Sequence, residues 1–386
     1  MDFNLLLTKV SILQQSIVLV DTVKQVVHTE FSVSRFIEEA LNHVIEANAS
    51  DIHFEPSAIE LKIRYRKDGI LVDLFSVPIG LANKVLAHLK SLAHLNVAEN
   101  RKPQDGRMTL EIGGKPLNFR VSTIPVQFGE SLVLRILDPC SMHFELKDLG
   151  LNDQLIEMIR KIARKPHGIF IVTGPTGSGK TTTLYSLLKD IYSPKKKYLT
   201  VEDPVEYLIP GVSQVSINNA IGLTFARVLR AFLRHDPDMI MVGEIRDLET
   251  AQIAVQASLT GHLVLTTLHT NSAASAVTRL IDLGLPPCLI ASSLQGVLAQ
   301  RLIRIFCEGC KGKGCAECKN TGFLGRTGIF ELMPISHPLR HLISQNAPLS
   351  FIDTQAQADG MIKLADSGLR LVELGKASLK ELNGIL

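Results

Sequence analysis

A glycine-rich octapeptide holds the residues of this sequence that are best suited to chemistry. It comprises Gly174, Pro175, Thr176, Gly177, Ser178, Gly179, Lys180 and Thr181. The octapeptide follows an apolar run and precedes a segment compatible with a helix, which is the context of a phosphate loop. Its glycines let successive backbone N–H groups point inward beside the positive end of the helix dipole, so the loop suits a polyphosphate. We expect Lys180 to reach the β and γ phosphates and the Thr181 hydroxyl to coordinate Mg²⁺.

Two carboxylates stand at the ends of apolar, strand-like runs, where phosphoryl transfer needs them. One carboxylate must orient or deprotonate water, and others must hold the metal. Glu244 ends the run 238–243 in the form of a Walker-B element, although Gly243 stands where many such motifs carry aspartate. It is the candidate for a water-mediated metal contact, and Glu202, at the end of another run, is the candidate general base. Either residue alone would more simply be a solvated loop carboxylate, but a neighbouring phosphate loop favours catalysis.

Length and composition set broad limits on fold and function. The chain has 386 residues, which is enough for two or three domains. A hydrophobic share of 46% and a charged share of 20% describe an ordinary soluble globular protein, and the net charge of +3 argues neither for nor against nucleic acid. The apolar stretch from Met1 to Val20 is too short and too polar to span a bilayer, which predicts a cytosolic protein.

Four of the six cysteines form two C-x2-C pairs, and they are better suited to a metal than to disulfides. They are Cys307, Cys310, Cys315 and Cys318. In reduced surroundings these pairs supply four thiolates at tetrahedral geometry, so we expect a closed structural Zn²⁺ site.

The elements that must position these residues fall into consecutive parts of the chain. Apolar strands alternate with helices after residue 150, which predicts a parallel sheet covered by helices on both faces, with the phosphate loop at the carboxyl end of a strand. The strands are expected at 169–173, 198–201, 239–243 and 263–267. The expected parts are a short lead at 1–30, an α+β domain at 31–140, a linker at 141–150, the ATPase core at 151–306, the tetracysteine loop at 307–328 and a helical subdomain at 329–386.

Several motifs in order make the sequence similar to the secretion ATPase superfamily of type II secretion and type IV pilus assembly, the GspE/PilB group. The phosphate loop matches the Walker A of this family. Residues 202–207 match its Asp box, 229–247 its Walker B, 260–270 its His box and 322–331 the segment after its metal loop, while 49–56, 101–107 and 119–122 resemble its second N-terminal domain. The resemblance implies an α/β fold: a RecA-like P-loop NTPase core, a preceding α+β (PAS-like) domain, and a small zinc-bearing, helical C-terminal part.

The resemblance also implies roles for residues outside the loop. His262 and His269, on one strand-like run at the ligand end of the sheet, would sense the γ-phosphate. Arg120 and Arg135, on strands of the preceding domain, would swing onto the γ-phosphate and stabilise the transition state. Nucleotide would then close this domain onto the ATPase core around a hinge at 138–150. Taken singly, a packed histidine and a solvated strand arginine are the simpler alternatives.

The activity that the resemblance implies is Mg-ATP hydrolysis by a homo-hexameric ring. Such a ring drives assembly of a type II secretion pseudopilus or a type IV pilus. It is cytoplasmic and peripherally associated with the inner membrane through platform proteins, and no nucleic-acid partner is expected. The alternatives are a pilus-retraction ATPase, against which the cysteines argue, and a regulatory module that senses nucleotide without hydrolysis, against which the intact Lys180, Glu202 and Glu244 argue.

Two features depart from the family pattern. Only four residues separate the cysteine pairs, where the family usually has a much longer stretch, which leaves the role of this loop in docking open. The lead at 1–30 is too short for the additional N-terminal domain with which the family's assembly ATPases grip their platform. The chain is therefore expected either to dock differently or to be a truncated version.

Overall fold

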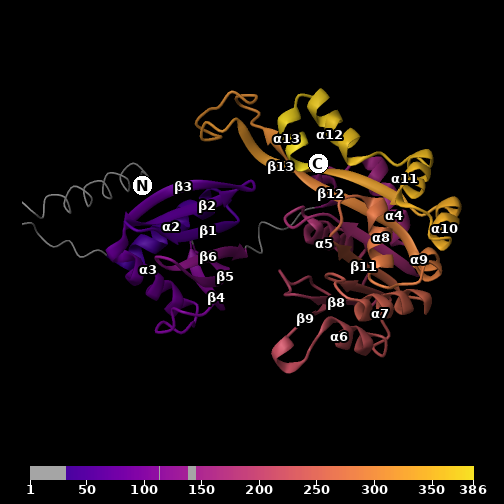
Figure 1. The fold of residues 1–386 in the computed structure, drawn as a ribbon, viewed down its shortest axis with the longest axis horizontal. Coiled ribbons are helices and arrows are strands. Elements are labelled where there is room, and N and C mark those ends of the chain that lie inside the picture. The colour runs from indigo at the N-terminus through magenta and orange to yellow at the C-terminus, as the bar shows by residue number, and fades with distance from the viewer. Residues whose placement is uncertain (1–31, 113, 138–144) are drawn as a thin grey trace, which may run out of the picture. The chain divides into compact units, whose positions relative to one another are not determined.

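The computed structural model describes residues 32–112, 114–137 and 145–386, and it divides the chain into two compact units. The division falls between Pro139 and Cys140 (Figure 1). The predicted lead at 1–30 and residues 138–144 of the predicted hinge lie outside the described residues.

Over residues 32–112 and 114–137, the first unit combines two helices with a six-stranded antiparallel sheet. The helices are α2 (Val33–Glu46) and α3 (Ile79–Leu92). The strands are β1 (Asp51–Pro56), β2 (Glu60–Lys67), β3 (Ile70–Pro78), β4 (Gln104–Ile112), β5 (Lys115–Val126) and β6 (Gly129–Leu137), in the order β3-β2-β1-β6-β5-β4. Alternate residues of β1, Ile52 and Phe54, are fully buried in the core that the helices cover. The intervening residues belong to the opposite face, because side chains alternate along a strand.

The second unit is built on a seven-stranded sheet with one antiparallel edge strand. Its strands are β7 (Gly168–Thr173), β8 (Tyr198–Glu202), β9 (Val212–Ser216), β10 (Met239–Val242), β11 (Leu263–Leu268), β12 (Leu294–Phe306) and β13 (Phe323–Pro334). They lie in the order β13-β12-β7-β11-β10-β8-β9, and only the β12–β13 pair is antiparallel. Six of these strands therefore end at one carboxyl edge, which is where such sheets bind ligands.

Both faces of this sheet are covered by helices, which explains its nearly continuous apolar strands. In β7, Ile169 and Ile171 belong to one core cluster, and Phe170 and Val172 belong to the other. Helices α4 (Asp153–Ala163) and α5 (Lys180–Ile191) cover the second face. The remaining helices are α6 (Phe225–Phe232), α7 (Leu248–Leu259), α8 (Ala273–Asp282), α9 (Pro287–Ser293), α10 (His337–Ser344), α11 (Leu349–Ala358), α12 (Leu364–Glu373) and α13 (Leu379–Ile385). Among the described residues, no helix has both the length and the apolar character that a bilayer crossing requires.

The fold agrees with the predicted α/β class, and it adds strands that the sequence pattern did not indicate. The four predicted core strands are present as β7, β8, β10 and β11, whereas β9, β12 and β13 were not predicted. Strand β13 runs across position 328, where the cysteine loop was expected to give way to a helical subdomain, and the helices begin only at His337. It pairs along its length with β12, so the cysteine loop is the connection between two long strands.

Candidate active site and metal centre

The phosphate loop connects the end of β7 to α5, and its backbone has the conformation that the glycines permit. Gly177 and Gly179 have φ of +78° and +85°, which disfavour any side chain. A Cβ atom on Gly174 would lie 2.5 Å from both the Gln300 carbonyl oxygen and Ser178 Oγ. Helix α5 begins without a side-chain cap, so its first N–H groups are available to a ligand.

Two observations within the loop fit a polyphosphate. Ser178 Oγ is buried and has no hydrogen-bond partner among the described residues. Lys180 Nζ donates to the carbonyl oxygens of Gly174 and Pro175, at 2.9 Å each, and so lies over the loop. Burial lowers the pKa of Lys180 to about 8, and the Glu244 carboxylate opposes this shift. A cation held over inward-pointing N–H groups is suited to phosphate oxygens.

A cavity of about 320 Å³ opens in front of the loop, within the range of small-molecule sites. It brings residues of the phosphate loop together with three of the other candidates, Glu202, Glu244 and His269. Its lining includes Thr176, Gly177, Gly179, Lys180, Thr181, Glu202, Asp203, Glu206, Glu244 and His269. The site therefore combines the phosphate loop with the ends of β8, β10 and β11.

Glu244 follows β10 and faces the loop from across this cavity. One of its oxygens lies 3.5 Å from His269 Nε2, and Arg246 makes an ion pair with the same carboxylate. Burial lowers the pKa of His269, and the nearby Lys180 lowers it further, against the opposing effect of Glu244. His269 is therefore mostly neutral at pH 7.

Glu202 ends β8 in a closed hydrogen-bond network on the inner wall of the cavity. It is only 3% exposed. The Tyr185 hydroxyl donates to one carboxylate oxygen, while Thr200 Oγ1 and Gln214 Nε2 donate to the other at 2.5 and 3.3 Å. Burial raises the pKa of Glu202, and these hydrogen bonds partly offset the shift. Both oxygens of the predicted general base thus accept hydrogen bonds, three in all, whereas Glu244 has Arg246 at one oxygen and His269 at the other, and both carboxylates line the cavity.

The sequence analysis missed the residues that hold Glu202, although Tyr185 gave a signal. It lies among Leu184, Leu187 and Leu188 on α5 and is buried with them. A buried tyrosine hydroxyl usually has a polar partner, so a tyrosine on an apolar helix face next to a phosphate loop indicates a nearby acceptor. Gln214 lies on β9, a strand that was not predicted.

The two predicted histidines lie at opposite ends of β11, so the prediction that both stand at the ligand edge is wrong for His262. His262 precedes the strand and His269 follows it, and six strand residues span about 20 Å. His262 Nδ1 lies 2.9 Å from the Ala257 carbonyl oxygen, and the His262 carbonyl accepts from Gly168 N at the start of β7. His262 therefore connects α7 and β7 at the amino edge, away from the phosphate loop.

Arg120 and Arg135 belong to the first unit, where they are direct cross-strand neighbours on β5 and β6. Both are exposed. Arg135 Nε donates to Asp51 Oδ1 at 2.8 Å. Arg107 on β4 is paired opposite Arg120, which extends the row of arginines to three strands. This row is a concentration of positive charge on one sheet face.

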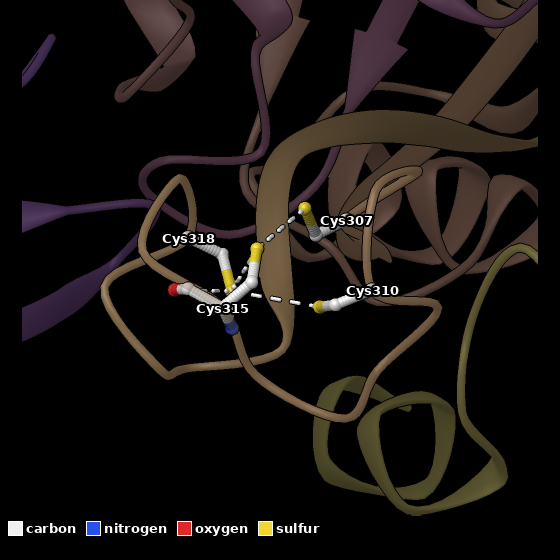
Figure 2. Close-up of side chains that lie close together, drawn as sticks. All are labelled: Cys307, Cys310, Cys315 and Cys318. Carbon is white, nitrogen blue, oxygen red and sulfur yellow. Dashed lines mark hydrogen bonds between the residues drawn. The ribbon is translucent and has the colours of Figure 1, made fainter.

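The four cysteines of the loop between β12 and β13 lie together (Figure 2). Their sulfur atoms are all within 4.8 Å of one another, and three pairs are separated by 3.7–3.8 Å. Zinc–sulfur bonds of about 2.3 Å place tetrahedral sulfurs about 3.8 Å apart, so this donor set fits zinc. Backbone N–H groups of Cys315 and Gly322 donate to Cys318 Sγ at 3.2 and 3.3 Å. Such donors stabilise a metal-bound thiolate.

A phosphate loop at the carboxyl edge of a parallel sheet, with an acidic residue facing its lysine, defines a P-loop nucleotide-binding protein. Comparison with known proteins places it more narrowly. The chain belongs to the family described as Type II/IV secretion system protein, which matches residues 27–384.

Three similar proteins illustrate the family. The type II secretion system protein HxcR of Pseudomonas aeruginosa is 48% identical over 358 residues, covering 91% of this chain and 76% of the relative. The type IV pilus assembly ATPase PilB of Thermus thermophilus is 43% identical over 379 residues, covering 91% of this chain and 43% of the relative. The solved structure of the pilus retraction motor PilT with bound ADP has 29% identity and a TM-score of 0.66, covering 91% of this chain and 96% of that one.

Proposed function

We propose that this chain is the ATP-hydrolysing subunit of a hexameric motor that drives assembly of a type II secretion pseudopilus or a type IV pilus. The observation that carries the proposal is that Lys180, on the phosphate loop, and Glu244 line the same cavity. The names of the relatives support the secretion and assembly roles. The retraction motor, at 29% identity, is the less similar protein and makes retraction the second candidate.

In this proposal each residue of the cavity has a defined task. Lys180 and the N–H groups of the loop bind the phosphates. The Thr181 hydroxyl and, through water, Glu244 would hold Mg²⁺, which neutralises charge on the phosphate oxygens when bound. His269 senses the γ-phosphate. Glu202 accepts a proton only after Tyr185 releases one of its oxygens or Thr200 and Gln214 both release the other. Glu244 has a single partner at each oxygen, Arg246 at one and His269 at the other, and orients water once either of them moves aside.

The proposal extends to the setting of the motor. A homo-hexamer would work with platform proteins at the inner membrane while the subunit itself stays cytoplasmic, and no nucleic-acid partner is included. The cysteine loop would hold one structural Zn²⁺ with no position left for catalysis.

The experiment that tests the proposal measures ATP hydrolysis against protein concentration, with size-exclusion chromatography and light scattering on the same samples. We expect turnover per subunit to rise as a hexamer forms, because the arginines of the first unit would complete the site only in the assembled ring. Glu244→Gln should form the same assembly and bind ATP but lose turnover by at least about a hundredfold. ATP binding without turnover at any concentration would favour the nucleotide sensor, and concentration-independent turnover would contradict the ring.

A further inference from the structure

Strand β12 places one polar residue on each face of the sheet, next to the phosphate loop. Side chains alternate along a strand, so Gln300 and Arg301 point to opposite faces. Gln300 Oε1 accepts from Thr183 Oγ1 of α5 at 2.7 Å, which joins β12 to the helix that follows the loop. Arg301 reaches the segment 269–272 between β11 and α8 instead.

Arg301 is a buried cation whose hydrogen bonds go to neutral acceptors. Arg301 is only 5% exposed. It donates to the carbonyl oxygens of Gln300 and Asn271, both at 3.0 Å, and to Asn271 Oδ1 at 3.2 Å. No ion pair involving Arg301 is found within residues 145–386. Burial lowers the pKa of Arg301 and the nearby Glu331 carboxylate only partly opposes this shift, so the buried charge is costly and packing alone would be served better by an apolar residue of similar size.

The segment that Arg301 contacts carries His269 and is fixed at three points. Thr270 N donates to Thr173 Oγ1 of β7 at 3.0 Å. The Arg301 guanidinium binds both oxygens of Asn271. Ala273 N, at the start of α8, donates to Glu331 Oε1 of β13 at 2.7 Å. The middle contact comes from one guanidinium nitrogen, Nη2 of Arg301, which donates to two acceptors on one residue.

We propose that Arg301 is a positioning residue that holds His269 opposite Glu244 through its grip on Asn271. This inference rests on the proposed function, since His269 and Glu244 are the groups that face the γ-phosphate there. Two nitrogens of the rigid guanidinium plane are used at once, because Nη1 donates to the Gln300 carbonyl oxygen and Nη2 to both oxygens of Asn271, whereas a lysine ammonium in the same place is a flexible point charge with one nitrogen. Arg301→Lys therefore keeps the positive charge but loses the fixed set of hydrogen bonds that holds Asn271 in place.

The test compares Arg301→Lys and Asn271→Ala with a matched control, Arg340→Lys. Arg340 also donates to neutral acceptors, among them Gln295 Oε1 at 2.9 Å, but at the amino end of β12, roughly 20 Å along the strand from Arg301. We expect kcat for ATP hydrolysis to fall about ten- to a hundredfold in the first two variants, with ATP affinity changed less than about threefold. Arg340→Lys should leave both quantities close to wild type.

A double-mutant cycle separates positioning from general destabilisation. If Arg301 acts through His269, Arg301→Lys should cost little further kcat in a His269→Ala background. A full additional loss in that background, or a loss of ATP affinity as large as the loss of kcat, would overturn the proposal. Asn271→Ala carries the same test if Arg301→Lys fails to fold.

A second readout needs no turnover, so failure of the proposed function and failure of this inference can be told apart. In the nucleotide-free protein, the His269 pKa is followed by NMR titration of labelled histidines and assigned with His269→Gln. Release of the segment should raise the His269 pKa toward its ordinary value in Arg301→Lys and Asn271→Ala, because the ring leaves its partly buried place beside Lys180 and Arg246 while the attraction of Glu244 weakens as well. An unchanged pKa in both variants would contradict the inference even if the wild-type protein hydrolyses no ATP.

Discussion

At the scale of single residues, the two acidic candidates differ in what surrounds them. Glu202 is enclosed by three donors from Tyr185, Thr200 and Gln214, and Glu244 stands at the cavity beside Arg246 and His269. The sequence pattern placed both carboxylates at strand ends and therefore predicted a catalytic role for each. Their difference depends on hydroxyl and amide groups brought in from α5 and β9, which no local pattern around residue 202 contains.

Lys180 makes the affinity for ATP dependent on pH. Its pKa of about 8 means that it is charged at pH 7 and loses its charge as the pH rises toward 9. Phosphate oxygens attract the charged form, so bound ATP raises this pKa and binding takes up protons between about pH 8 and 9. We expect ATP affinity to be greatest below pH 8 and to fall by up to about tenfold per pH unit above it. Calorimetry at pH 8.5 in two buffers of different ionisation enthalpy measures the uptake directly.

Lys180→Met is the control for this titration, because it removes the titrating group and keeps a side chain of similar length. It should bind ATP weakly and show no proton uptake in the same range. Wild-type binding without proton uptake at pH 8.5 would mean that Lys180 does not carry the pH dependence.

At the scale of elements, the sequence predicted the inner strands well and the edge of the sheet poorly. Strands β7, β8, β10 and β11 are short apolar runs with turn signals on both sides, so their positions were clear. Strand β12 is also mostly buried, but periodicity alone does not separate a buried strand from a buried helix, and it directly follows α9. Because β12 was not predicted, neither were the contacts of Gln300 and Arg301, which join the phosphate loop and the His269 segment to the rest of the sheet.

The cysteine loop gives a prediction about metal content. Protein purified under reducing conditions with zinc present should contain about one zinc ion per chain, as the closed four-sulfur geometry indicates. Cys315→Ser removes one of the four ligands and should lower the content to near zero, with a lower melting temperature because metal binding contributes to folding. The content is measured by mass spectrometry of the metal and checked with a colorimetric chelator after thiol modification.

Cys288→Ser is the matched control for metal content. Cys288 is an exposed free cysteine outside the loop, so its substitution should leave the zinc content unchanged. Absence of zinc from the wild-type chain, or equal losses in the two variants, would show that the four sulfurs do not form the expected site.

At the scale of the whole molecule, the two units divide the expected chemistry between them. The second unit holds the phosphate loop and the acidic residues, and the first holds Arg107, Arg120 and Arg135 in a cross-strand row. Like charges directly opposite one another are destabilising, and an anion bound to the row would relieve this repulsion. Among the described residues, an ion pair is found for Arg135, with Asp51, but none for Arg107 or Arg120.

Arg120→Ala tests whether this row serves catalysis. We expect kcat to fall by at least about a hundredfold, because a guanidinium on the transferring phosphoryl group stabilises charge that develops in the transition state. ATP affinity should change little, since the phosphate loop is intact. Lys62→Ala, on β2 of the same sheet, is the control, because its ammonium pairs with Asp73 rather than joining the row. Turnover that is equal in wild type and Arg120→Ala would count against delivery of this arginine to the nucleotide.

A mixing experiment then shows whether the arginine acts within one chain or between chains. Lys180→Ala subunits have a disabled phosphate loop and an intact Arg120, and Arg120→Ala subunits have the reverse. Each variant alone should be nearly inactive.

If the arginine of one subunit completes the site of its neighbour, equal mixing into hexamers restores roughly a quarter of wild-type turnover, because one subunit in two has an intact loop and half of those have a suitable neighbour. If each chain closes its own first unit onto its own nucleotide, mixing restores nothing, and the predicted hinge at 138–150 would carry the whole movement. The two outcomes differ because in a ring the chain that binds ATP need not be the chain that supplies the arginine.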